Sequence, residues 1–208
     1  MKVQRFVSKV IAVNVLICYD ETSKDAVIFD PSGNTKKIFD FISENELNLK
    51  AIILTHGHFD HIHAVDKIKD KYNVPIAACD AEVSLLMDAN KNYSKVYCGV
   101  AMEIDPEIKF LDGDVIEFGT INFKVILTPG HSLGSCCFYN EESKVLITGD
   151  TLFLEDVGRT DLDYSAPAKM IPSIKEKLFV LPDDTVVYPG HGDFTTIGHE
   201  KVHNRSVI

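Results

Sequence analysis

Basic residues are scarce in this sequence of 208 residues, which has 21 Lys and Arg against 31 Asp and Glu and a net charge of −10. Proteins that hold nucleic acid by its phosphates present a basic face to it. The charge balance therefore argues against a nucleic-acid partner. It leaves open a small anionic substrate, because one local arginine can override the overall charge at a pocket.

Disulfide and export signals are also lacking. The five cysteines are odd in number and form no C-x-x-C pair, which favours reduced thiols in a cytosol over a secreted disulfide framework. The N-terminal apolar run "VIAVNVLICY" is followed by "DETSKDAVIFD", which predicts a turn and another strand instead of a signal-peptide cleavage site. We expect a cytoplasmic protein with no membrane partner.

The chain has no low-complexity tract, no repeat of fixed period and no linker rich in Pro, Gly or Ser. Hydrophobic residues make up 45% and charged residues 25%, which is ordinary for a globular protein. A chain of this length can bury a sizeable core without disulfides. We therefore expect one domain over residues 1–208, and the sequence indicates no oligomeric state.

Strand and helix patterns alternate along the chain, which is typical of an α/β sandwich. "NVLICY" and "DAVIFD" flank a polar turn and predict a hairpin, whereas "KKIFDFISENE" has helical spacing. A further predicted helix has one apolar stripe, which consists of Ile62, Val65, Ile68 and Tyr72. A further helix is expected within 165–178, where Pro172 should kink or divide it.

Four predicted strands, "AIILT", "FKVILTPG", "VLITG" and "VVYPG", end in side chains that bind metals. Those side chains are His56, His58, Asp60 and His61 after the first strand, His131 after the second, Asp150 after the third and His191 after the fourth. In layered α/β folds, functional residues gather in loops beyond strand ends. The shared position of these residues predicts a single site.

Neutral imidazoles and carboxylates suit zinc, iron or manganese. The close spacing in H-x-H-x-D-H requires a tight loop before a helix, because residues two apart do not share a helix face. Two ligand sets can be filled, with Asp150 as a bridge between the ions. The sets are His56, His58 and His131 for one ion, and Asp60, His61 and His191 for the other.

The motifs "THGHFDH", "TPGHSLGS", "TGDTLF" and "YPGHG" resemble, in this order, those of the metallo-β-lactamase superfamily. "VGRTDL" and "YPGHGDFTTIGHEK" are similar to hydrolases related to type II glyoxalases, the hydroxyacylglutathione hydrolases. The resemblance implies an αββα fold, with two mixed β-sheets flanked by helices, and the ligand assignment above. It also implies that Asp30 in "FDPSG" orients a ligand histidine.

Two divalent ions, zinc first with iron or manganese as alternatives, would activate a bridging hydroxide and polarise a carbonyl. A small thioester or ester is the expected substrate, because a thiolate with a pKa around 8.5 leaves without a strong general acid. Asp60 and Asp150 are the expected catalytic residues. Arg159 is expected either to hold a substrate carboxylate or to form a salt bridge with Asp161 or Asp163. Phe59 is expected either to line the wall of the pocket or to pack beneath it.

Other functions occur on the same motifs. The resemblance extends to persulfide dioxygenases, which implies a single Fe(II) held by His56, His131 and Asp150, with open positions for O₂. A ribonuclease is less favoured, because the chain is short, acidic and without an added RNA-binding domain. An electron-transfer module would carry a flavin or redox domain, for which the sequence gives no signal.

Overall fold

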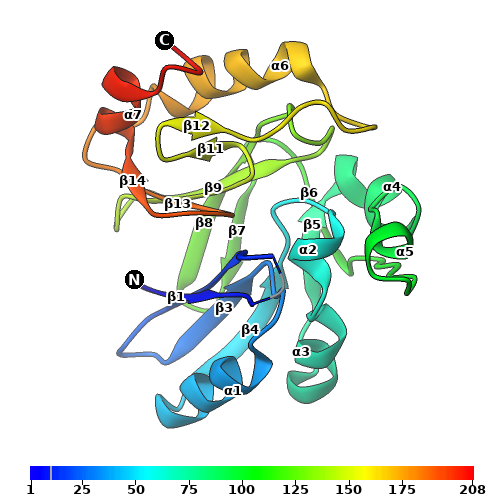
Figure 1. Ribbon diagram of the computed structural model, residues 1–208. Helices are drawn as coiled ribbons and strands as arrows, with labels where there is room; N and C mark the ends of the chain where they lie inside the picture. The colour runs from blue at the N-terminus through cyan, green and yellow to red at the C-terminus, as the bar shows by residue number, and fades with distance from the viewer. Residues whose placement is uncertain (10) are drawn as a thin grey trace.

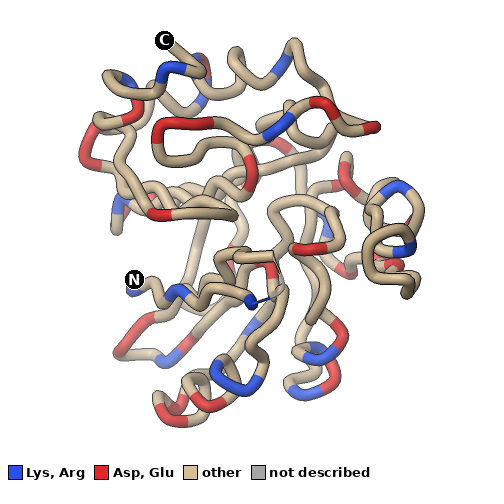
Figure 2. The backbone as a smooth tube through the Cα atoms, viewed as in Figure 1, with Lys and Arg blue, Asp and Glu red and all other residues tan. Residues whose placement is uncertain are grey.

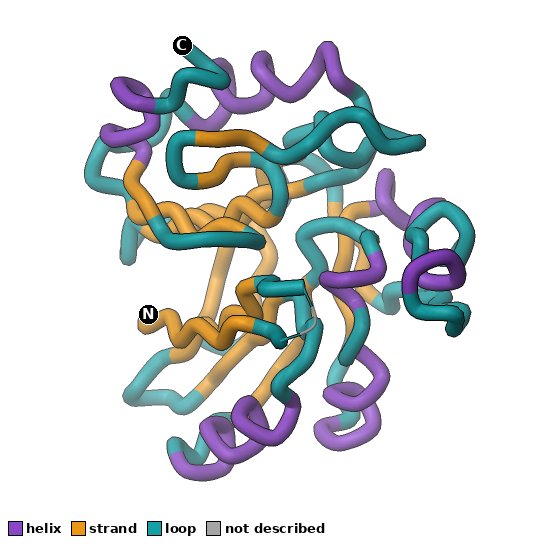
Figure 3. The backbone as a smooth tube through the Cα atoms, viewed as in Figure 1, coloured by secondary structure: helices purple, strands orange, loops and turns teal. Residues whose placement is uncertain are grey.

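The computed structural model describes residues 1–9 and 11–208. Within these residues, two six-stranded mixed sheets lie face to face, with helices on their outer sides (Figure 1). Figure 3 shows the strands at the centre and the helices around them. The αββα architecture expected from the sequence is therefore confirmed. Val10, which begins the N-terminal apolar run, lies outside the described residues.

The first sheet has the order β1-β2-β3-β4-β5-β6. Its strands are β1 (Lys2–Val7), β2 (Asn14–Tyr19), β3 (Asp25–Phe29), β4 (Asn48–Ile53), β5 (Ile76–Cys79) and β6 (Ile108–Phe110). β1, β2 and β3 pair antiparallel, so the hairpin predicted from "NVLICY" and "DAVIFD" is confirmed. From β3 to β6 the pairing is parallel, which brings the carboxyl ends of these strands to one edge.

The second sheet has the order β14-β13-β10-β9-β8-β7. Its strands are β7 (Val115–Phe118), β8 (Ile121–Leu127), β9 (Cys136–Asn140), β10 (Val145–Gly149), β13 (Val186–Pro189) and β14 (Thr195–Thr196). β10 and β13 pair in parallel, whereas the other neighbours are antiparallel. A small ribbon of β11 (Leu152–Phe153) and β12 (Asp156–Val157) follows β10.

Helices cover both outer faces. They are α1 (Thr35–Glu44), α2 (Phe59–Ile62), α3 (Val65–Tyr72), η1 (Asp80–Glu82), α4 (Val83–Leu86), α5 (Ser94–Tyr97), α6 (Pro167–Pro172), the π-helical η2 (Ser173–Leu178) and α7 (Ile197–His203). Among the described residues, none of these helices has the length and apolar character that crossing a membrane requires.

The central strands are apolar on both sides because each sheet packs on two layers. Along β3, Ile28 packs with the residues of α1 and α3, whereas its neighbour Phe29 packs with the second sheet. The ring of Phe29 lies 5.2 Å from that of Phe123 and 5.1 Å from that of Phe138. Alternate side chains of one strand thus join different cores.

Two helical predictions are refined by the structure. The stripe from Ile62 to Tyr72 is divided into α2 and α3, because the Ala64 N–H donates to the Pro31 carbonyl at 2.8 Å outside the helix ladder. The helix expected within 165–178 is present. Pro172 ends its α-helical part and the chain continues as η2, consistent with the hydrogen bond that proline cannot donate.

Candidate metal centre

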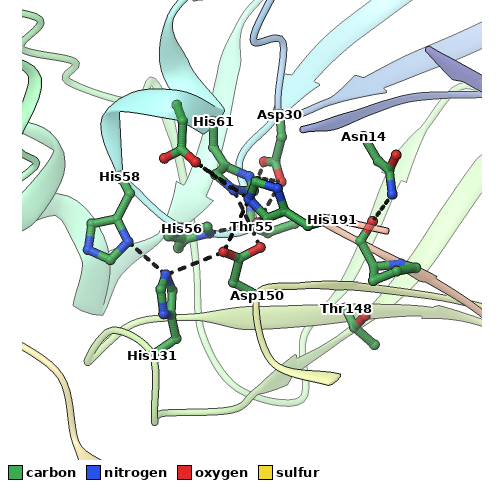
Figure 4. Close-up of polar contacts among 12 residues, drawn as sticks. Asn14, Asp30, Thr55, His56, His58, His61, His131, Thr148, Asp150 and His191 are labelled. Carbon is green, nitrogen blue, oxygen red and sulfur yellow. Dashed lines mark hydrogen bonds and ion pairs between the residues drawn. The ribbon is translucent and has the colours of Figure 1, made fainter. Parts of the chain in front are cut away.

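The seven side chains predicted from the sequence converge at one edge of the sandwich. They come from the segments that follow β4, β8, β10 and β13, and two of them, Asp60 and His61, lie on α2. Figure 4 shows the imidazoles of His56, His58, His61, His131 and His191 gathered around the carboxylate of Asp150. The structure therefore brings together residues that are up to 135 positions apart in the chain.

The first cluster, His56, His58 and His131, has ligand atoms within 4.8 Å of one another, and all three residues are buried. His58 Nδ1 lies 2.8 Å from His131 Nε2. Among the described residues, the buried Nε2 atom of His56 has no hydrogen-bond partner. Buried polar atoms are rarely left unpaired, so the histidine cluster fits a metal ion.

The second cluster is Asp60, His61 and His191, whose ligand atoms also lie within 4.8 Å of one another. Asp60 Oδ2 lies 3.5 Å from His191 Nε2 and 3.8 Å from His61 Nε2. This cluster is more open, because the side chain of His191 is 28% exposed. The mixed oxygen and nitrogen donors suit a divalent transition metal.

Asp150 lies between the two clusters. Its Oδ1 is 3.4 Å from His61 Nε2, and its Oδ2 is 3.5 Å from both His131 Nε2 and His191 Nε2. One carboxylate thus faces imidazoles of both sets, which is the position of a bridging ligand. A side chain on Gly190 would overlap this carboxylate, so the close approach of the His191 loop requires glycine there.

Two ligand histidines are oriented through their second ring nitrogen. His61 Nδ1 lies 2.9 Å from Asp30 Oδ2, and Asp30 also accepts from the Thr55 backbone N–H at 2.8 Å and from Thr55 Oγ1 at 2.6 Å. His131 Nδ1 lies 2.8 Å from the Arg159 carbonyl. Such contacts select the tautomer that directs Nε2 to a metal, the position the sequence suggested for Asp30.

Glu82, which the sequence reasoning missed, connects the loops of the first cluster. This buried carboxylate accepts from the Gly57 N–H at 2.9 Å, the Gly134 N–H at 2.8 Å and Ser132 Oγ at 2.9 Å. Burial raises the pKa of Glu82, although these three donors oppose the shift. Glu82 thereby holds the chain beside His58 against the chain beside His131.

The pKa values of His56 and His58 shift in the opposite direction from that of His61. Burial and the neighbouring imidazoles lower the pKa of His56. Burial and the neighbouring His131 lower the pKa of His58 to about 3. Burial also disfavours a charged His61, but three nearby carboxylates outweigh it and raise its pKa. Burial alone would raise the pKa of Asp60 and Asp150, but the adjacent histidines lower both. The carboxylates are therefore ionised and ready to bind cations.

A cavity of about 550 Å³ opens onto the clusters. Phe59 and Arg159 both line it, as the sequence suggested, together with Tyr93 and Tyr97, which it did not. The ring of Phe59 stacks on Tyr97 with centroids 5.0 Å apart. Arg159 has the ion pair that was its alternative, because its Nε and Nη2 donate to the two carboxylate oxygens of Asp161 at 2.7 and 2.9 Å.

The fold and the paired clusters define an αββα protein with a buried His/Asp metal site. A family model described as the metallo-beta-lactamase superfamily matches residues 10–191. The chain belongs to this superfamily, as its motifs suggested.

Two curated relatives match over most of their length. The probable metallo-hydrolase YqgX of Bacillus subtilis (strain 168) is 38% identical over 179 residues, 86% of this chain and 85% of the relative. The hydroxyacylglutathione hydrolase GloC of Haemophilus influenzae is 35% identical over 195 residues, 92% of this chain and 91% of the relative.

Solved structures agree with this assignment. The BLEG-1 B3 metallo-beta-lactamase superimposes with a TM-score of 0.92 at 35% identity, over 98% of both chains. TTHA1623, solved in a di-iron-bound form, gives a TM-score of 0.81 at 31% identity, over 96% of this chain and 98% of that one.

Proposed function

We propose that the protein is a metal-dependent hydrolase that cleaves a small thioester or activated ester. The observation that carries this proposal is the position of Asp150, within 3.5 Å of imidazoles from both three-ligand clusters. A site with two complete clusters and a shared carboxylate suits two divalent ions. The names of YqgX and GloC support hydrolysis, and that of GloC supports a thioester.

In this proposal one ion would be held by His56, His58 and His131 and the other by Asp60, His61 and His191, and Asp150 would serve both. Zinc is our first expectation, with iron or manganese as alternatives, and the di-iron form of TTHA1623 supports iron. When bound, a pair of divalent ions lowers the pKa of water and polarises a substrate carbonyl. Asp60 borders the cavity and is ionised. Its Oδ2, which faces His61 and His191, would hold the ion, which would leave Oδ1 to accept a proton from the attacking water.

A thioester is favoured over an amide by the leaving group. A thiolate with a pKa around 8.5 departs without being protonated, whereas an amine needs a proton from a positioned acid. The fork of Arg159, which borders the cavity, is able to hold a carboxylate on the substrate once Asp161 is displaced. Phe59 supplies an apolar wall between two ligand residues.

Hydrolysis of S-lactoylglutathione tests the proposal. Protein loaded with zinc, iron or manganese in turn should remove the thioester absorbance, and His58→Ala or Asp60→Ala should abolish turnover. The exposed His63 lies in the same segment outside both clusters, so His63→Ala is the matched control. Absence of turnover for this substrate and for simpler thioesters, with all three metals, would contradict the proposal.

The persulfide dioxygenase alternative uses only His56, His131 and Asp150 and one Fe(II). It leaves the complete cluster of Asp60, His61 and His191 without a role, so the geometry favours the binuclear hydrolase. Metal analysis separates the two functions. Two ions per chain and no oxygen uptake support hydrolysis, whereas one iron with uptake of O₂ in the presence of a persulfide supports the alternative.

A further inference from the structure

The cavity beside the metal clusters is largely apolar beyond the ligands themselves. Its remaining walls are Phe59, Tyr93, Tyr97 and Phe153, with Ile11, Val157 and Leu162. Among the described residues that line it, Arg159 is the one lysine or arginine. The chemistry of the walls therefore favours a substrate with a substantial apolar part and few charges.

The aromatic side chains stand next to both clusters. The ring of Tyr93 lies 5.8 Å from that of His58, and the ring of Phe153 lies 6.2 Å from that of His191. The rings of Phe59 and Tyr97, which also line the cavity, are stacked on each other with an angle of 23° between their planes. Aromatic groups prefer such stacked or edge-on contacts, so a planar or branched apolar acyl group is complementary to this wall.

Arg159 offers one place for an anionic group. Its fork is occupied by Asp161, but both side chains are largely exposed, at 60% and 69%, and exposed ion pairs are weak. A substrate carboxylate of the same shape can replace Asp161. Glutathione carries two carboxylates and an ammonium group and coenzyme A carries several phosphates, so both need more polar partners than this cavity provides.

The net charge of the whole molecule also disfavours a carrier with many negative charges. Its net charge of −10 repels polyanions, and Figure 2 shows the Lys and Arg segments interspersed with Asp and Glu segments over the whole chain. Cationic recognition of a large anionic carrier would instead gather basic residues around the cavity.

We propose that the substrate is a thioester of an aromatic or branched aliphatic acid that carries at most one carboxylate, for which Arg159 exchanges its partner Asp161. This inference rests on the proposed hydrolase function and specifies its substrate class. Asp161 is then a positioning residue that competes with the substrate for Arg159.

The test varies the two halves of the thioester separately. Phenylacetyl and lactoyl groups are each attached to N-acetylcysteamine, 3-mercaptopropionate and glutathione, and kcat/KM is measured with metal-loaded protein. Phenylacetyl thioesters should exceed lactoyl thioesters by at least about tenfold, the usual worth of an apolar pocket contact. The carrier with one carboxylate should exceed glutathione.

Variants connect these preferences to the named residues. Tyr97→Ala should lower kcat/KM about tenfold for phenylacetyl thioesters and leave lactoyl thioesters within about twofold. Phe194→Ala removes an exposed aromatic ring outside the cavity and is the matched control. Binding of phenylacetate followed by calorimetry gives a readout that needs no turnover, and Tyr97→Ala should weaken it.

Asp161→Asn tests the exchange at Arg159. Releasing the guanidinium should lower KM by up to about fivefold, the range of an exposed ion pair, for thioesters with one carboxylate and leave the neutral N-acetylcysteamine thioester unchanged. Asp163→Asn is the control in the same loop. An equal effect of Asp161→Asn on both carriers would overturn the proposed exchange.

The outcomes separate this inference from the function on which it rests. If no thioester is cleaved with any metal, the hydrolase proposal fails. If thioesters are cleaved but S-lactoylglutathione has the highest kcat/KM, or Tyr97→Ala affects both acyl groups equally, the substrate class proposed here is wrong and the hydrolase stands.

Discussion

The two halves of the metal centre both contain buried histidines, but the pKa values of these histidines shift in opposite directions. His58 is buried among other imidazoles, and burial with His131 lowers its pKa to about 3. His61 is equally buried, but carboxylates surround it and its pKa is raised. His58 is thus neutral and free to bind a cation, whereas His61 can hold a proton instead.

This contrast predicts an order of loading. His56 and His58 are neutral at pH 7 and ready for metal, because metal ligands must be deprotonated. The cluster of Asp60, His61 and His191 must first lose the proton of His61. The first ion should therefore bind to His56, His58 and His131, and the second should bind with more dependence on pH.

The largest expected effect comes from removing one ligand of either cluster. His58→Ala should leave about one ion per chain, bound at the carboxylate cluster, and Asp60→Ala about one ion at the histidine cluster, since each loses one of three protein ligands. Both should lose hydrolytic activity to the background of the assay. Metal content by mass spectrometry checks the result, with His63→Ala as the control that keeps two ions.

Equal loss of both ions in either variant would show that the clusters do not fill independently. In that case the contrast between them would have no consequence for metal binding.

Glu82→Gln should have the next largest effect. The amide retains one acceptor oxygen, so it cannot accept from Gly57, Ser132 and Gly134 in the present arrangement. Loss of such supporting contacts typically lowers the metal affinity by about 10–100-fold. We expect this loss at the histidine cluster and little change at the carboxylate cluster, measured by competition with a chromophoric chelator.

The exposed Glu103 supplies the control, Glu103→Gln, which should bind both ions normally. The free energy of unfolding of the metal-free variants tests the structural role of Glu82. A buried polar group left without a partner lowers this free energy by about 1–3 kcal/mol. A destabilised Glu82→Gln protein with unchanged metal affinity would limit Glu82 to a structural role.

The smallest expected effect is on the number of protons released when the metal ions bind. Because the pKa of His61 is raised, its imidazole is protonated below that pKa, and binding of the second ion should release about one proton. The affinity for this ion should fall about tenfold per pH unit as the pH decreases below the pKa of His61. Because the pKa values of His56 and His58 are lowered, these two ligands should release no proton to the first ion near pH 7.

Calorimetric titrations in buffers of different ionisation enthalpy measure these protons. Asp30→Asn removes one of the carboxylates that favour the charged His61, so proton release should decrease in this variant. Equal proton release for both ions would contradict the assignment of opposite protonation to the two clusters.

Much of the site was predictable because its ligands follow local strand-end motifs. The H-x-H-x-D-H string requires a tight loop wherever it occurs, and His131, Asp150 and His191 each directly follow an apolar strand pattern. The sequence also suggested Asp150 as a bridge, and its distances to imidazoles of both clusters depend on how the two sheets stack.

The segment from residue 80 to 100 was not predictable in this way. It consists of the short elements η1, α4 and α5, which have too few turns for a helical period. Glu82 meets Ser132, 50 positions away, and Tyr97 meets Phe59. The strand β1 was missed as well, because its burial is only partial and its alternation is weak.

The sequence by itself determined which side chains are available to bind metal, because each lies within a short motif whose backbone geometry is local. Only the tertiary structure decided their protonation. His58 and His61 are three residues apart in one motif, but their pKa values shift in opposite directions. Electrostatic energy depends on distance to charges, and folding brings Asp30 and Asp150 to His61 and leaves His58 beside His131.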